Sequence, residues 1–212
     1  MNSVMKFLLR TYCRVIFLAS AAMALAAVVL NVIFPDYIFT SYLASFPMFE
    51  VIFSTVYGIQ LSSLNLTTAL TMGSRRRDFN LAAHICIALT AAVSLMVIYA
   101  VYRLDLKLHL VTDQSYYYRP EDTGIMAFYL LSGQIIGMGC STLTRFRRVL
   151  TSVVFGVILM VLTMSFVFQM LSGIFEWNFW GDLTYIITGL IIVLDIAAEV
   201  LFQRMLPREV VR

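Results

Sequence analysis

The sequence has 212 residues, of which 61% are hydrophobic and only 13% charged, with a net charge of +3 at pH 7. A soluble domain typically has about 45–50% apolar and about 25% charged residues, so this composition excludes a water-soluble globular protein. The small positive charge is explained by orientation in a membrane rather than by nucleic-acid binding. The cysteines Cys13, Cys86 and Cys140 form no CxxC pair, which indicates neither a metal site nor a disulfide framework.

Residues 1–14 form a short amphipathic segment. Lys6, Arg10 and Arg14 recur every four residues and therefore share one helical face. This pattern predicts a helix that lies in the plane of the lipid headgroups. A cleaved signal peptide is the alternative, because a basic start precedes an apolar run. That run continues to Phe34, which is long for a signal and favours an uncleaved first span.

Six apolar runs follow one another along the chain, each close to the ~20 residues that cross a bilayer as a helix. Their approximate ranges are 15–34, 51–72, 79–102, 124–143, 149–171 and 183–202. The four prolines, at positions 35, 47, 120 and 207, fall outside these ranges, as expected for residues that interrupt helices. The sequence therefore predicts an all-α polytopic membrane protein with a single transmembrane domain over 1–212.

The second predicted span contains a stripe of polar residues. On one continuous helix, Gln60, Ser63, Thr67 and Thr71 would lie on the same side. Such groups in lipid need partners or water. The stripe is interpreted either as part of a substrate path or as a set of interhelical hydrogen bonds, and both readings remain open.

A short basic turn joins the second and third spans. Its candidate residues for contact with a partner are Gly73, Ser74, Arg75, Arg76, Arg77 and Phe79. A basic turn between apolar spans sets membrane topology. Arginine also binds carboxylates through two parallel hydrogen bonds, and we expect the phenylalanine to supply an apolar anchor.

Further polar positions occur in the later spans. His84 is either a proton-coupling residue or a histidine at a helix interface. The alternation of polar and apolar residues over 103–110 predicts a strand or an extended segment within a polar outer loop, 103–123. Gly133 and Gly137 form a GxxxG pattern, which permits close contact between helices.

The last span contains two carboxylic acids, Asp195 and Glu199, four residues apart and so on one face. Acids within a span are costly unless they face protein or water, which makes them candidates for a transport role. A structural role is the alternative, with Arg204 as the ion-pair partner of Glu199.

The distribution of basic residues predicts the orientation. With six spans, twelve of the 15 Lys and Arg residues fall on one side, and Arg103, Lys107 and Arg119 fall on the other. Because basic loops stay in the cytoplasm, both termini are expected to be cytoplasmic. The sequence has no P-loop and no zinc or serine hydrolase motif, so we expect neither an enzyme nor a cofactor in this chain.

The stretch before and within the basic turn resembles a known family. Ala69, Leu70, Gly73, Arg76 and Phe79 follow the pattern A-L-x-x-G-x-x-R-x-x-F. With six spans and an amphipathic start, this pattern resembles the small permease subunits of type-2 ABC exporters, which lie in the bacterial cytoplasmic membrane. The sequence departs from the family in its short outer loops, which provide no large extracellular domain.

The resemblance implies several partners. A separate cytoplasmic ATPase subunit, holding ATP and Mg²⁺, would contact the 73–79 turn, and a second permease subunit would form a homo- or heterodimer in the lipid. The substrate would be amphipathic, such as a peptide, a lipid or a drug. The alternative is a stand-alone proton-coupled transporter or a regulatory membrane subunit that uses Asp195 and Glu199.

Overall fold

The computed structural model describes residues 3–33, 42–62, 66–71, 75–108, 122–144, 158, 161 and 178–205, and these residues form helices without any strand. In chain order the elements are α1 (Ser3–Leu8), the π-helix η1 (Leu9–Cys13), α2 (Arg14–Ile33), α3 (Tyr42–Gln60), α4 (Leu66–Thr71), α5 (Arg76–Leu108), α6 (Thr123–Thr144) and α8 (Asn178–Met205).

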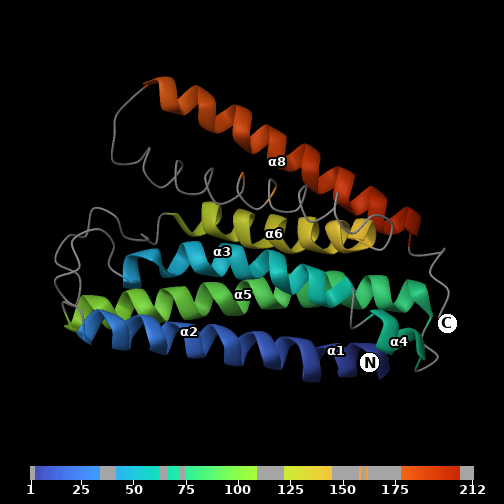
Figure 1. Cartoon of the computed structure of the whole chain (residues 1–212), viewed down its shortest axis with the longest axis horizontal. Helices are drawn as coiled ribbons and strands as arrows, with labels where there is room; N and C mark the ends of the chain where they lie inside the picture. Colours follow the sequence, from blue (N-terminus) through green and yellow to red (C-terminus); the bar gives the residue numbers. More distant parts are fainter. Residues whose placement is uncertain are drawn as a thin grey trace.

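The long helices lie side by side (Figure 1). Helix α6 packs against α3, α5 and α8, while α2 packs against α3 and α5. Helix α8 is inclined relative to the other helices, and the start of α1 and the end of α8 lie at the same end of the bundle (Figure 1). Helix α6 is therefore the main neighbour of α8 in the bundle.

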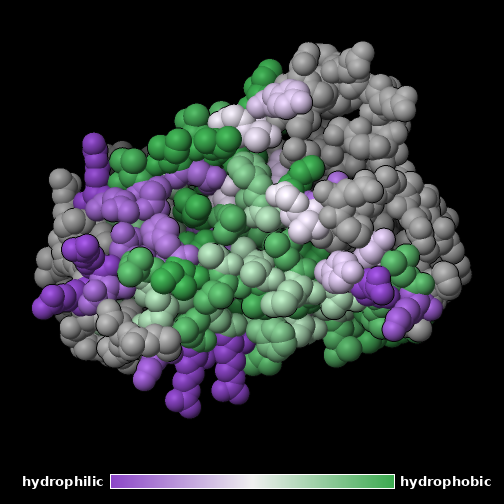
Figure 2. Space-filling model, turned by 180° about the vertical axis from the view of Figure 1, so that it is seen from behind, coloured by the Kyte–Doolittle hydropathy of each residue, from purple (hydrophilic) through white to green (hydrophobic). Residues whose placement is uncertain are grey.

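Within the described residues, four helical segments are long and apolar enough to cross a membrane: Met5–Ile33, Arg77–Lys107, Thr123–Ser141 and Tyr185–Arg204. Large apolar side chains on α2, α5 and α8 are exposed, for example Val32, Met96 and Val193. Figure 2 shows hydrophobic side chains across the middle of one face, with hydrophilic ones gathered toward the left end and in a smaller group at the lower right. This surface suits lipid, and the described residues confirm the expectation of a helical protein with several candidate membrane spans.

The predicted spans 79–102, 124–143 and 183–202 each fall within one helix: α5, α6 and α8. Helix α5 has 33 residues and is therefore about 50 Å long, more than the ~30 Å hydrocarbon core. Its exposed basic residues Arg77 and Lys107 lie near its two ends, which suits side chains that reach toward lipid headgroups. The predicted span 149–171 lies outside the described residues apart from Ile158 and Val161, so the total of six spans and the orientation remain predictions.

The prediction of one helix over 51–72, with Pro47 outside it, is wrong. Helix α3 begins at Tyr42, includes Pro47 and ends at Gln60, and α4 is a separate short helix. Pro47 is the sixth residue of α3 and so lies beyond the first four amide groups that have no acceptor within a helix; it removes one backbone hydrogen bond from the second turn, and the helix continues through it. The sequence SSLN after Leu61 contains serine and asparagine, whose side chains compete for backbone hydrogen bonds and favour the end of a helix.

The amino-terminal segment is not a separate interfacial helix. Elements α1, η1 and α2 follow one another without interruption from Ser3 to Ile33, since no glycine or proline breaks this stretch. Lys6, Arg10 and Arg14 share an exposed side, as the periodicity predicts. The opposite side packs on α5 rather than on lipid, and the Tyr12 hydroxyl donates a hydrogen bond to the Tyr57 carbonyl oxygen at 2.8 Å.

The strand expected from residue 103 onward is also wrong over its first part, because α5 continues to Leu108. Arg103 and Lys107 are exposed and Asp105 is buried, which is a helical distribution. Eight alternating residues are a short signal, and the long helix that precedes them overrides it over 103–108. Residues 109–121 of the expected outer loop lie outside the described part of the chain.

Glycines allow α3 and α6 to pack at a short distance from each other. A Cβ atom at Gly137 would overlap the carbonyl oxygen of Thr55, and one at Gly133 would overlap the Ser54 hydroxyl. On the opposite helix, a Cβ atom at Gly58 would overlap the carbonyl oxygen of Gln134. Small residues let two helices approach closely in lipid, where van der Waals packing rather than hydrophobic burial drives helix association.

Gly137→Ala should therefore weaken the bundle. The added methyl group meets backbone, which cannot move aside, and overpacking of this kind costs about 1–3 kcal/mol. Gly189→Ala on α8 is the matched control, since a Cβ atom there meets nothing within 4 Å. Thermal unfolding of the purified protein in detergent measures both variants. A Gly137→Ala protein as stable as the Gly189→Ala protein would contradict the close contact.

Candidate functional site

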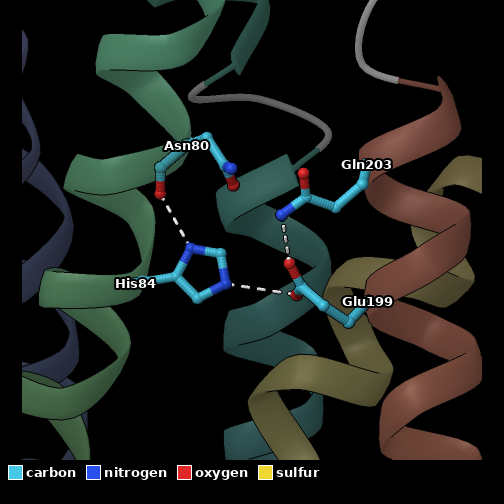
Figure 3. Close-up of polar contacts among 4 residues, drawn as sticks. All are labelled: Asn80, His84, Glu199 and Gln203. Carbon is cyan, nitrogen blue, oxygen red and sulfur yellow. Dashed lines mark hydrogen bonds and ion pairs between the residues drawn. The ribbon is translucent and has the colours of Figure 1, made fainter.

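A polar contact joins α5 to α8 across the bundle (Figure 3). His84 Nε2 lies 3.1 Å from Glu199 Oε2, and His84 Nδ1 lies 2.8 Å from the Asn80 carbonyl oxygen. Gln203 Nε2 donates a hydrogen bond to Glu199 Oε1 at 2.6 Å. The carboxyl group of Glu199 therefore has one partner on its own helix and one on α5.

The contacts of His84 define where its protons are. A carbonyl oxygen only accepts hydrogen bonds, so Nδ1 must carry a proton. The hydrogen bond between Nε2 and Glu199 then contains one further proton, which belongs either to the imidazole ring or to the carboxyl group. The side chains of His84 and Glu199 are 39% and 30% exposed. The shared proton therefore lies between α5 and α8 in a contact that is only partly buried.

The pair lies near the end of the bundle that contains the basic turn. His84 is eight residues after the start of α5, or about 12 Å along the helix axis. The structure pairs Glu199 with His84 rather than with Arg204, whose side chain is exposed. The contact joins α5 to α8, which agrees with the interpretation of His84 as an interface residue, and the proton-coupling role stays a prediction.

Asp195 makes a second contact between helices. Ser132 Oγ on α6 donates a hydrogen bond to Asp195 Oδ2 at 2.6 Å. Asp195 Oδ1 is buried and has no hydrogen-bond partner within the described residues. Asp195 and Glu199 thus both make contacts with other helices of the bundle, Asp195 with α6 and Glu199 with α5.

The sequence did not single out Glu50, the most deeply buried acid of the described chain, with no exposed surface. Starting the second span at Val51 assigned Glu50 to a loop, whereas it lies inside α3. The available signal was its position between Phe49 and Val51 in a run that is apolar from Tyr42 onward. Gln134 on α6 was missed as well, and it accepts a hydrogen bond from Thr90 Oγ1 on α5 at 2.7 Å.

The predicted polar stripe is not carried by one helix. Gln60 is the last residue of α3, and Ser63 lies outside the described residues. Thr67 and Thr71 belong to α4, and their side chains are not described. The regular spacing that placed these residues on one face therefore does not apply across the break between α3 and α4.

The basic turn is described in part. Arg75 and Arg77 are exposed, Arg76 begins α5, and Gly73 and Ser74 lie outside the described residues. The Phe79 amide donates a hydrogen bond to the Arg75 carbonyl oxygen at 3.1 Å, which closes the first turn of the helix.

The prediction that Phe79 offers an exposed apolar anchor is wrong. Its side chain has no exposed surface and belongs to a buried cluster that includes Leu8 of α1 and Phe202 of α8. A phenylalanine next to a basic turn is equally suited to fixing that turn from inside, and burial in this cluster is the larger hydrophobic gain.

Cys13 and Cys86, isolated in the sequence, are brought together by the packing of η1 on α5, and their thiol groups hydrogen-bond to each other. Both are free thiols, and Cys140 is a buried free thiol elsewhere. Among the residues the structure describes, no group of three or more His, Cys, Asp or Glu side chains could hold a metal ion.

Comparison with protein-family models, with curated proteins and with solved structures found no match. The chemistry of the site therefore follows from its own side chains. These are a histidine and a glutamate that share a proton, and an aspartate held by a serine, all inside a bundle of apolar helices. Intramembrane groups of this kind are typical of transport pathways, and helix association also uses them.

The contact between His84 and Glu199 should contribute to the stability of the bundle. In a double-mutant cycle, His84→Ala and Glu199→Ala together should cost less than the sum of the single changes, by about 0.5 kcal/mol or more. Chemical unfolding in detergent measures each free energy. His84→Ala combined with Ser132→Ala is the control cycle and should be additive, because Ser132 bonds to Asp195 instead. Additivity of the His84 and Glu199 changes would show that the contact is absent in solution.

Proposed function

We propose that this chain is the transmembrane permease subunit of an ATP-driven exporter in the bacterial cytoplasmic membrane, moving an amphipathic substrate outward. The observation that supports this proposal is the basic start of the long apolar helix α5, where the side chains of Arg75 and Arg77 are exposed. The pattern that resembles type-2 ABC permeases, Ala69–Phe79, includes this basic start of α5.

The arginines supply the docking chemistry. A guanidinium group offers a planar pair of N–H donors that matches a carboxylate, so an acidic groove on a cytoplasmic ATPase subunit is a suitable partner. That subunit, rather than this chain, would hold ATP and Mg²⁺. The exposed side chains of Arg75 and Arg77 remain available for such contacts, with Arg76 between them.

Phe79 provides the mechanical connection in this proposal. It lies four residues from Arg75 and packs in a buried cluster with Leu8 and Phe202. A force on the basic turn would therefore reach α1 and α8 through close-packed side chains, which transmit displacement because protein interiors are nearly incompressible. Helix α8 contains Asp195 and Glu199, so movement of the ATPase would be linked to the polar contacts of the bundle.

A second permease subunit, identical or different, would complete the pathway. Helix α8 offers a broad exposed apolar surface, with Tyr185 at 79% and Ile186 at 69% exposure. Either lipid or a neighbouring subunit can cover such a surface, and a substrate path between two subunits would lie along it. Gln60, Asp195 and Glu199 remain the described candidates for a substrate path, and Asp195 and Glu199 face α6 and α5 rather than this apolar surface.

A stand-alone proton-coupled transporter is the second candidate function. The contact between His84 and Glu199 favours it, because a histidine and a carboxyl group that share a hydrogen bond within a bundle of apolar helices are a candidate proton relay. In this alternative, the basic turn would set only the topology.

Arg77→Glu should weaken the docking of an ATPase subunit and reduce ATP-driven export, while membrane insertion stays normal because Arg75 and Arg76 remain. A lost charge-assisted pair costs about 2 kcal/mol or more, so the yield of co-purified ATPase should fall at least severalfold. Arg103→Glu is the matched control, since Arg103 is an exposed arginine near the other end of α5.

Inverted membrane vesicles from the same strains distinguish the two candidates. Uptake that needs ATP and is lost in Arg77→Glu supports the exporter. Full ATPase co-purification and full uptake in Arg77→Glu would remove the docking role. Uptake that needs no ATP and collapses with a proton ionophore would favour the proton-coupled transporter.

A further inference from the structure

Glu50 of α3 lies in a polar site separate from the contact between His84 and Glu199. Its side chain has no exposed surface, and hydroxyl groups from two neighbouring helices reach it. Ser20 Oγ of α2 donates a hydrogen bond to Glu50 Oε2 at 3.2 Å. Ser94 of α5 hydrogen-bonds to the same carboxyl group. Both serines are buried, at 0% and 2% exposure.

Tyr57 is the fourth side chain at the same site. Tyr57 follows Glu50 by seven residues on α3 and so shares its face. Its hydroxyl group lies beside Ser20, and the tyrosine is 4% exposed. Oxygen atoms from α2, α3 and α5 thus converge on one point, and three helices must pack correctly to bring them there.

The site lacks a balancing positive charge. The buried polar side chains of the described residues include no lysine, arginine or histidine. Glu50 Oε1 and the Tyr57 hydroxyl have no hydrogen-bond partner within the same residues. An isolated carboxylate in a low-dielectric interior is strongly unfavourable, so a group in this position must be neutral or must be paired with a cation.

We propose that Glu50, Ser20, Ser94 and Tyr57 form a binding site for one monovalent cation, either H⁺ or Na⁺. The single carboxyl group supplies one negative charge, which one monovalent ion neutralises. Oxygen ligands suit hard cations and do not favour soft metals such as copper. When Na⁺ enters, the proton leaves the carboxyl group, and the net charge of the site is unchanged.

This site is independent of the proposed ATPase subunit. Its ligands lie on α2, α3 and α5, and none belongs to the basic turn or to α8. A cation at this point would hold α2, α3 and α5 together. Its binding or release would therefore change the stability of the packing of these three helices. Failure of ATPase docking would therefore leave the cation site untouched, and loss of the cation site would leave docking untouched.

Infrared spectroscopy of the purified full-length protein in lipid nanodiscs tests the proposal, because a protonated carboxyl group has its own C=O band. In choline buffer, the wild type should lose such a band as the pH rises, and Glu50→Gln should lack this change. At a fixed pH where the band is present, replacing choline by Na⁺ should remove it if sodium binds. A response to pH alone identifies the proton as the ligand. Asp122→Asn, which changes a partly exposed acid before α6, is the control and should keep the wild-type response.

Ser20→Ala tests the same site without removing the acid. The serine hydroxyl donates to the carboxylate form, so its loss should move the pH midpoint of the band upward by about one unit, a tenfold change in proton affinity. Identical difference spectra in the wild type and Glu50→Gln would overturn the proposal. A wild-type band that responds to neither pH nor Na⁺ would also overturn it, since Glu50 would then be a permanently protonated structural group.

Discussion

The close contact between α3 and α6 is the constraint on which the other helix positions depend. Gly58, Gly133 and Gly137 remove the side chains that would hold the two backbones apart. In lipid, apolar side chains gain little by moving from acyl chains to a neighbouring helix, so surface complementarity and polar contacts provide the specificity. Three glycines at matching heights provide such a surface, and they fix both the distance and the relative position of the two helices.

Besides its contact with α3, helix α6 contacts α5 and α8 through different residues. Gly139 lies against Ala198 of α8, where a Cβ atom would again be too close. Gln134 reaches Thr90 of α5, and Ser132 reaches Asp195 of α8. Small residues and hydrogen-bonding residues thus alternate around one helix. The result is a bundle in which the acids of α3 and α8 have partners on other helices, as intramembrane acids require.

The polar contacts connect helices that are far apart in the sequence. The helices themselves could therefore be predicted from the sequence, whereas the contacts between them could not. Run length and hydropathy predicted α2, α5, α6 and α8, because lipid imposes a minimum length of apolar helix. The same reasoning misplaced α3, since Pro47 and Glu50 resemble the polar end of a span.

Partners across the bundle could not be predicted from local patterns. His84 and Glu199 are separated by 115 positions, and nothing near either residue specifies the other. Phe79 looked like a surface anchor because of its basic neighbours, whereas tertiary packing buries it against α1 and α8. Cys13 and Cys86 likewise meet only through the packing of η1 on α5. Spacing along one helix shows which face a residue occupies, but not what that face meets.

The contact of α3 with α6 in the membrane can be measured directly by disulfide trapping. A Cβ atom at Gly133 lies 3.3 Å from the Ser54 Cβ atom, close to the roughly 3.5–4.5 Å found in disulfides. In a chain without its native cysteines, Ser54→Cys with Gly133→Cys should therefore cross-link in native membranes under mild oxidation. Ser54→Cys with Gly189→Cys, which lies on the open side of α8, should not. Equal cross-linking of both pairs, or none in the first, would contradict the arrangement of helices described here.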